Sequence, residues 1–166
     1  MLSKVSINRL LEAAAILEAF KPTKELKFDI SSWRSELTSK ANLRDVQHQC
    51  GTTACACGII ASQPKIRKRG FKLSVAHKDN HNTLFDRKGN EHKAVEVRYQ
   101  LDYKPNGYGS RKVSGDEAAA AYFGIDESDV RELFYDEGYN YDSNITAKTV
   151  AKAIRQFVKQ QLKQAA

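Results

Sequence analysis

The residues whose types could support chemistry are concentrated between His48 and Gly58, in the segment HQCGTTACACG. This segment holds all three cysteines of the chain. A zinc site would use His48 with the three cysteines, but in a helix the two-residue spacing directs Cys55 and Cys57 to nearly opposite sides. The segment therefore predicts no metal site, and we expect no cofactor.

A cysteine nucleophile is the second possibility for this segment. Cys50 would lie just before a helix N-terminus, where the helix dipole lowers the pKa of a thiol, with His48 or another histidine as base. Nothing in the spacing fixes that pair, and free cysteines are among the most buried residues in proteins. The leading hypothesis is a non-catalytic protein with Cys55 and Cys57 in its core. The alternative is a cysteine-dependent enzyme with Cys50 as nucleophile.

The turn that enters the predicted helix offers a third possibility. Free N–H groups at Gly51, Thr52 and Thr53, together with the threonine hydroxyls, would bind a phosphate at a helix start. A pocket lined by Tyr108 and Tyr139 would complete a site of nucleotide size. The alternative is that one threonine simply caps a buried helix.

Two basic groups predict contact with phosphates. The first is a short loop, and the second follows one face of the final helix; they comprise Lys65, Arg67, Lys68, Arg69 and Lys72, and Lys148, Lys152, Arg155, Lys159 and Lys163. Because no acid follows Asp142, the helical stripe is not compensated locally and would lie on a nucleic-acid backbone without reading its sequence. The alternative is a solvated face whose partner is the acidic segment 126–142.

Charge is strongly polarised along the chain. The formal net charge is +7, yet segment 126–142 carries seven acids and one arginine, a net charge of −6. The remainder therefore sums to +13, which favours an anionic partner such as a nucleotide or a nucleic acid. The acidic, tyrosine-rich segment would alternatively dock on a basic host protein.

Periodicity predicts helices at both ends of the chain. Apolar residues spaced by three and four from Ile7 to Phe20 indicate an amphipathic helix that ends before Pro22. A second, shorter helix is predicted to begin in FDISSW (28–33), with Trp33 and Leu37 on one side. The small residues of Gly51–Ser62 indicate a buried helix.

The middle of the chain has the two-residue period of strands. Residues 95–103 alternate apolar and polar, and so do residues 71–75. Turn-forming residues 86–90 separate Leu84 and Phe85 from the long strand, which predicts an antiparallel meander of about three strands.

Helical signals return after residue 113. Ser114 to Glu117 predicts a capping box for a helix that ends at Gly124, Asp126 opens another helix, and Thr146 caps a last helix that ends near Leu162. Together these elements predict a single α+β domain over residues 1–166, helical in 5–62, a β-meander in about 70–104, and helical again in 114–163.

Compartment and partners follow from composition. No segment has the apolar length of a membrane span or a signal peptide, and three closely spaced cysteines do not form a secreted disulfide scaffold. We expect a cytoplasmic protein without membrane contact. The sequence carries no signal for a particular oligomeric state.

A family resemblance rests on Cys50 to Gly58 (CGTTACACG), together with FDISSW (28–33) and AYFGI (121–125). These motifs resemble small proteins encoded by bacteriophages and bacterial mobile elements, to which no activity is assigned. Cys57 stands where a larger apolar residue is usual, which favours a packing role. The resemblance implies a phage-type accessory protein in the cytoplasm of a bacterial host, binding a host protein, nucleic acid or nucleotide to counter a host system.

Overall fold

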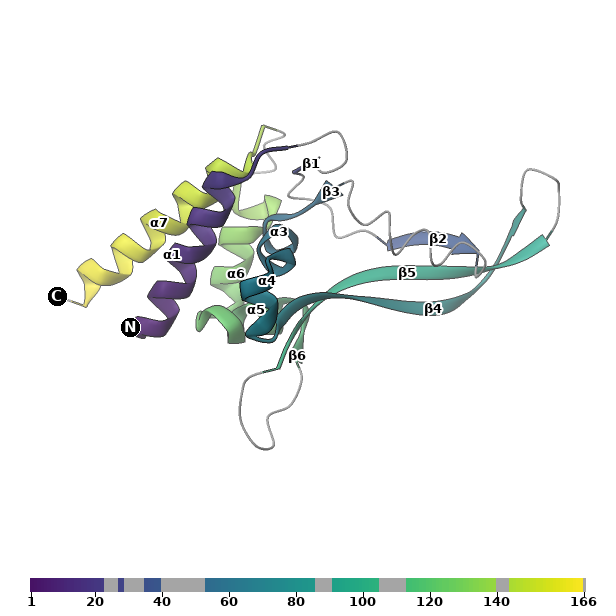
Figure 1. Cartoon of the computed structure of the whole chain (residues 1–166), viewed down its shortest axis with the longest axis horizontal. Helices are drawn as coiled ribbons and strands as arrows, with labels where there is room; N and C mark the ends of the chain where they lie inside the picture. Colours follow the sequence, from purple (N-terminus) through teal and green to yellow (C-terminus); the bar gives the residue numbers. More distant parts are fainter. Residues whose placement is uncertain are drawn as a thin grey trace.

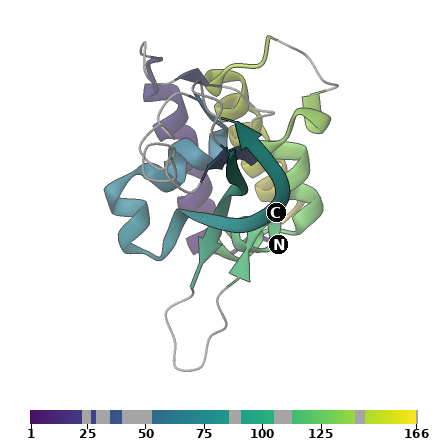
Figure 2. The ribbon, with the colours of Figure 1, turned by 90° about the vertical axis from the view of Figure 1, so that its right-hand side faces the viewer.

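The computed structural model describes residues 1–22, 27–28, 35–39, 53–85, 91–104, 113–139 and 144–165. Its helices gather at one end, and a long two-stranded hairpin extends away from them (Figure 1). Seen from the hairpin side, the strands curve in front of the helices (Figure 2). The α+β fold class predicted from the sequence is confirmed.

The described elements follow one another from helices to hairpin and back to helices. The helices are α1 (Lys4–Ala19), α3 (Ala56–Ser62), α4 (Pro64–Lys68), α5 (Gly115–Phe123), α6 (Glu127–Phe134), the 3-10 helix η2 (Asp136–Tyr139) and α7 (Ala147–Gln164). The strands are β1 (Lys27–Phe28), β2 (Ser35–Ser39), β3 (Thr53–Ala54), β4 (Phe71–Phe85), β5 (Glu91–Tyr103) and β6 (Val113–Ser114). None of the described helices is both long enough and apolar enough to cross a membrane.

The main sheet is antiparallel, with the order β2-β5-β4, and β6 also pairs with β5. Phe71 lies opposite Tyr103 at the base of the hairpin, and Phe85 lies opposite Glu91 at its far end. Pairing of β4 with β5 continues beyond an irregularity in the register as far as Phe85, and the predicted turn at residues 86–90 lies outside the described residues. The third strand of the sheet comes from β2.

Residues 35–39 form strand β2 instead of continuing the short helix predicted to begin in FDISSW. Leu37 pairs with Glu96 and Ser35 with Arg98. The sequence Ser-Glu-Leu-Thr-Ser suits an edge strand, and backbone pairing with β5 outweighs a weak helical preference. The predicted helical region 5–62 is therefore interrupted by strands, and Trp33 lies outside the described residues.

Helices α1 and α7 pack against each other and supply much of the core. As predicted, α1 ends before Pro22, and Thr146 caps α7, here through reciprocal bonds with Thr149. Apolar residues at three and four spacing lie on the buried faces of both helices. These residues are Leu10, Ala13, Ala14 and Leu17 of α1, and Val150, Ala151, Ile154 and Val158 of α7.

Aromatic stacking joins the base of the hairpin to the helices. The ring of Phe71 stacks on Tyr122 of α5 at 4.5 Å, and Phe123 stacks on Phe134 of α6 at 5.1 Å. The guanidinium of Arg9, from α1, lies 4.6 Å from the centre of the Tyr122 ring. This cluster fixes β4, α5, α6 and α1 relative to one another.

The ends of α5 agree only in part with those predicted from the sequence. Gly124 ends the helix in the left-handed conformation, φ 68°, as predicted. Ser114 occupies the N-cap position, but its side chain makes no capping hydrogen bond, so the predicted capping box is wrong. The chain turns there at Gly115, whose φ is 61°.

Candidate functional site

The exposed side of α7 carries a row of cations, as the sequence predicts. Lys148, Lys152, Arg155, Lys159 and Lys163 are all exposed, and helical geometry places them within an arc of about 80° over about 22 Å. Burial of Val150, Ile154 and Val158 fixes the rotation of α7 about its axis and turns this row toward solvent.

Arg155 is held by an acid of α1. Its Nε and Nη2 atoms donate to the two carboxylate oxygens of Glu18 at 2.6 and 2.7 Å. The hydrogen bond from Arg155 lowers the pKa of Glu18, and the same bond raises the pKa of Arg155. This bidentate ion pair connects the middle of α7 to the end of α1, and the charge of Arg155 is therefore partly neutralised.

The four lysines of the row, here called the α7 lysine face, differ from Arg155. Within the described part of the chain none of them forms a salt bridge; they are Lys148, Lys152, Lys159 and Lys163. The acidic segment 126–142 was the alternative partner for this stripe, but the ion pair that α7 makes among the described residues goes to Glu18. As far as the described residues go, the α7 lysine face is therefore available to an outside anion.

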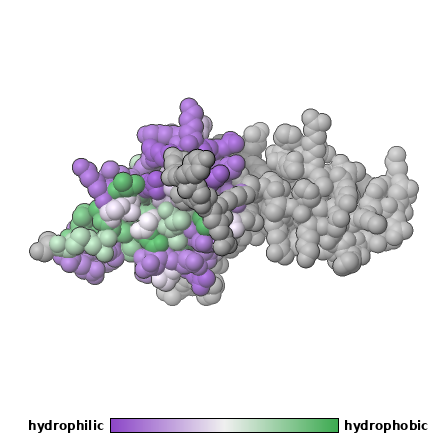
Figure 3. Space-filling model, turned by 90° about the horizontal axis from the view of Figure 1, so that it is seen from below, coloured by the Kyte–Doolittle hydropathy of each residue, from purple (hydrophilic) through white to green (hydrophobic). Residues whose placement is uncertain are grey.

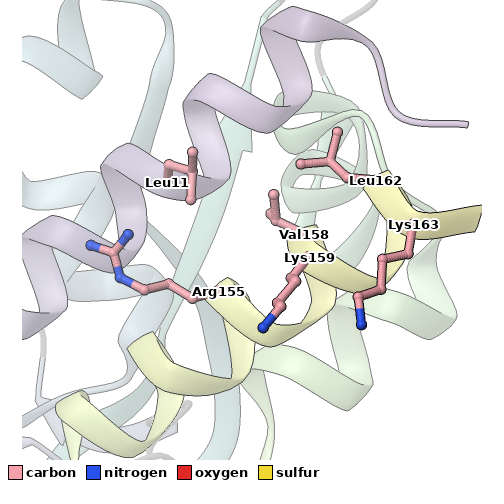
Figure 4. Close-up of a pocket in the computed structure, with 6 residues that line it drawn as sticks. All are labelled: Leu11, Arg155, Val158, Lys159, Leu162 and Lys163. Atoms are coloured by element: carbon pink, nitrogen blue, oxygen red, sulfur yellow. The ribbon is translucent and has the colours of Figure 1, made fainter. Parts of the chain in front are cut away.

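A groove lies beside the α7 lysine face, between α1 and α7 (Figure 4). Its volume is about 580 Å³, and Leu11 of α1 lines it together with Val158 and Leu162 of α7. Arg155, Lys159 and Lys163 also border it. Leu162 is 50% exposed, so apolar surface and positive charge meet at this end of the molecule.

The second basic group does not form the predicted loop: Lys65, Arg67 and Lys68 lie on the short helix α4, Arg69 caps its end, and Lys72 lies in β4. Lys65 and Arg69 both pair with Glu12 of α1, the former at 3.1 Å. Burial alone would raise the pKa of Glu12, but the hydrogen bonds and charges of these two cations outweigh it and lower the pKa. Of the residues in this group, Arg67, Lys68 and Lys72 are exposed without an ion pair in the described chain.

The two basic groups lie on different sides of α1. Glu12 pairs with cations of α4, whereas Glu18 pairs with Arg155 of α7. Six residues of helix separate Glu12 from Glu18, a rotation that leaves them about 120° apart around the axis. The α7 lysine face has four lysines without an ion pair in the described chain, more than the basic group around α4.

The cysteine segment enters a helix later than predicted. Thr53 lies in β3, where it pairs with Lys27, and α3 begins only at Ala56. The helix that would have started at Gly51 is shortened because Thr53 and Ala54 complete a two-stranded parallel pair. Thr53 therefore does not lie at the helix start, whereas its predicted role in binding phosphate stays a prediction. His48, Cys50, Gly51 and Thr52 lie outside the described residues.

The two described cysteines are buried. The Sγ atom of Cys55 accepts a hydrogen bond from the Gly58 N–H at 3.4 Å, which satisfies a donor at the start of α3. Cys57 is 1% exposed, and burial raises the pKa of its thiol well above the ordinary value. A protonated, buried thiol is a poor nucleophile, so Cys57 acts in packing, while Cys55 caps the start of α3.

The pocket predicted from Tyr108 and Tyr139 stays a prediction, because only Tyr139 is described. Tyr108 lies outside the described residues, and the hydroxyl of Tyr139 donates to the Leu133 carbonyl at 2.8 Å. Burial raises the pKa of Tyr139. In the same region Tyr135 donates to Asp116, which also binds Arg131 at 3.1 Å. These tyrosines close the protein's own surface.

No family model, curated protein or solved structure matches this chain. The geometry of α7 and the groove is therefore the basis on which a function can be inferred. Sequence reasoning found the cations of that surface but missed Glu18, Leu11 and Leu162. The apolar Leu162 among the charged residues at the end of the final helix was the available signal for the groove.

Proposed function

We propose that this chain is a non-catalytic, phage-type accessory protein that binds an anionic macromolecule, a nucleic-acid backbone or the acidic surface of a host protein, through α7. The observation that carries the proposal is the α7 lysine face: four exposed lysines over about four turns of one helix, without an ion pair in the described chain.

Two features support a macromolecular anion over a nucleotide. The lysines are spread along about 22 Å of helix, a distance that suits several successive anionic groups better than one compact phosphate group. Thr53, which was predicted to belong to a phosphate-binding turn, lies in strand β3. A row of cations along one helix face favours backbone contacts over recognition of one small molecule.

Paired charge reversals test the proposal. The variant Lys152→Glu/Lys159→Glu removes two members of the α7 lysine face, and Arg67→Glu/Lys68→Glu makes the same charge change on α4. Fluorescence anisotropy would measure binding of a labelled DNA duplex and of labelled polyglutamate at about 0.1 M salt, where each lysine–phosphate contact contributes about eightfold.

We expect the α7 variant to lose more than about 60-fold in affinity for the duplex, because two contacts are removed and two repulsions are added. The α4 variant should lose much less. Equal losses in the two variants would overturn the assignment to α7, and absence of binding by the unchanged protein to both polyanions would overturn the function.

A further inference from the structure

The groove between α1 and α7 is lined by the half-exposed Leu162, the partly buried Leu11, and Val158, which is 3% exposed. Leu11, Val158 and Leu162 are directed into the space between the two helices (Figure 4). Seen from below, apolar residues form a band across the helical end of the molecule, with hydrophilic residues on both sides (Figure 3). The large apolar side chains exposed in the described chain are Met1, Val5 and Leu162, at 98%, 58% and 50%.

Positive charge borders this apolar floor along α7. Lys159 and Lys163 are one helical turn apart and lie on the side of α7 that faces away from Leu11 and α1 (Figure 4). Arg155 crosses toward α1 and is bound there by Glu18. The groove thus combines an apolar floor with two lysines that have no anionic partner in the described chain.

The shape and charge of the groove discriminate among anions. A nucleic-acid backbone would satisfy the lysines but leave the leucines in water, and a membrane surface is too flat to fill a hollow between two helices. A helix with one apolar ridge fills such a groove through residues at three and four spacing. Acids beside that ridge would lie about 6 Å apart, matching Lys159 and Lys163.

We infer that the groove formed by Leu11, Val158 and Leu162 docks an acidic amphipathic helix of a partner protein. The apolar ridge of the partner enters between α1 and α7, and its carboxylates bind Lys159 and Lys163. This inference rests on the proposed function, because the same lysine face is used, and it names an acidic protein segment as the anion.

A synthetic peptide serves as the probe. It has about 14 residues, enough for a helix of about 21 Å, with leucines at three and four spacing and glutamates on both flanks. A scrambled peptide has the same composition and charge without the ridge. A single-stranded oligonucleotide and vesicles containing phosphatidylserine provide anions of the other two kinds.

Three single variants separate apolar from charged contributions. Leu162→Gln removes apolar surface at a half-exposed position, so the fold should be retained, which circular dichroism would check. Lys159→Gln removes charge from the rim, and Arg67→Gln removes the same charge from α4. Each variant is titrated with both peptides and with the oligonucleotide.

We expect the ordered peptide to bind at least about tenfold more tightly than the scrambled one. Leu162→Gln should lower affinity for the ordered peptide about fivefold, through lost burial of its exposed half, and leave oligonucleotide binding unchanged. Lys159→Gln should weaken binding of both the ordered peptide and the oligonucleotide, whereas Arg67→Gln should weaken binding of neither.

Other outcomes would overturn the inference in distinguishable ways. Equal binding of the two peptides, or an unchanged affinity in Leu162→Gln, would show that the groove does not bind the peptide. Oligonucleotide binding in the same experiment would still support the proposed function. Binding to vesicles without binding to the ordered peptide would identify a lipid surface as the ligand. Failure to bind every anion would remove both proposals.

Discussion

The salt dependence of DNA binding provides a quantitative test of the α7 lysine face. If all four lysines contact phosphates, the logarithm of affinity for a DNA duplex should fall with the logarithm of salt concentration at a slope of about −3.6. Between 50 and 200 mM salt the affinity would then fall about 150-fold. Arg155 is left out of this count because Glu18 already binds it.

Neutralising two of the lysines should halve that slope. The variant Lys152→Gln/Lys159→Gln is expected to show a slope of about −1.8 and a loss of only about 12-fold over the same salt range. The assay is fluorescence anisotropy of a labelled duplex at four salt concentrations. Arg67→Gln/Lys68→Gln is the control, and its slope should stay near that of the unchanged protein.

Two results would refute this reasoning. A slope near zero in the unchanged protein would mean that few counterions are released, so the lysines would not lie on phosphates. A full slope in the α7 variant, with a reduced slope in the α4 control, would place the contacts on the other basic group.

Three further predictions concern the scaffold, and chemical denaturation measures each. Phe71→Ala should cost about 3–5 kcal/mol of unfolding free energy, because a fully buried stacked ring is lost. Gly115→Ala should lower the unfolding free energy by about 1–2 kcal/mol, because alanine is strained in the left-handed conformation of this position. Gly124→Ala should lower it further, because its new Cβ would also meet Ser6. Equal losses in the two variants would contradict this reasoning. Glu12→Gln should lower the unfolding free energy by less than about 1 kcal/mol near neutral pH. Because the fold lowers the pKa of Glu12 from 4.5, that difference should begin to decrease below pH 4.5 and vanish only below the lowered pKa of the folded protein. A loss that persists at still lower pH would contradict the ion-pair account.

Periodicity was sufficient for the helices whose faces are sharply divided. In α1 and α7 the apolar positions repeat at three and four, and the boundaries set by Pro22 and Thr146 agree with the structure. The exposed cations of α7 followed from the same pattern, because burying Ile154 and Val158 leaves only one face for lysine. These features depend on local sequence, so sequence alone could predict them.

The errors arose where a partner distant in the sequence decides the structure. Leu37 belongs to a strand because β5 offers an edge, and Thr53 belongs to a strand because Lys27 lies opposite. Neither pairing leaves a periodic signal in five or fewer residues. The ion pairs of Glu12 and Glu18 are equally non-local, so the sequence did not show that Lys65, Arg69 and Arg155 would be partly neutralised.

The pattern of charge on α7 also implies a link between stability and binding. Lys148 and Lys152 are four residues apart, as are Lys159 and Lys163, and like charges at this spacing destabilise a helix by about 0.2–0.5 kcal/mol per pair. Arg155, three or four residues from Lys152 and Lys159, would add repulsion if Glu18 did not bind it. The fold therefore relieves repulsion at the centre of the row and leaves it at both ends. An anion that spans the row removes the remaining repulsion, so binding should stabilise α7 beyond the contacts it forms, and substitutions that remove these lysines should stabilise the free protein while weakening its binding.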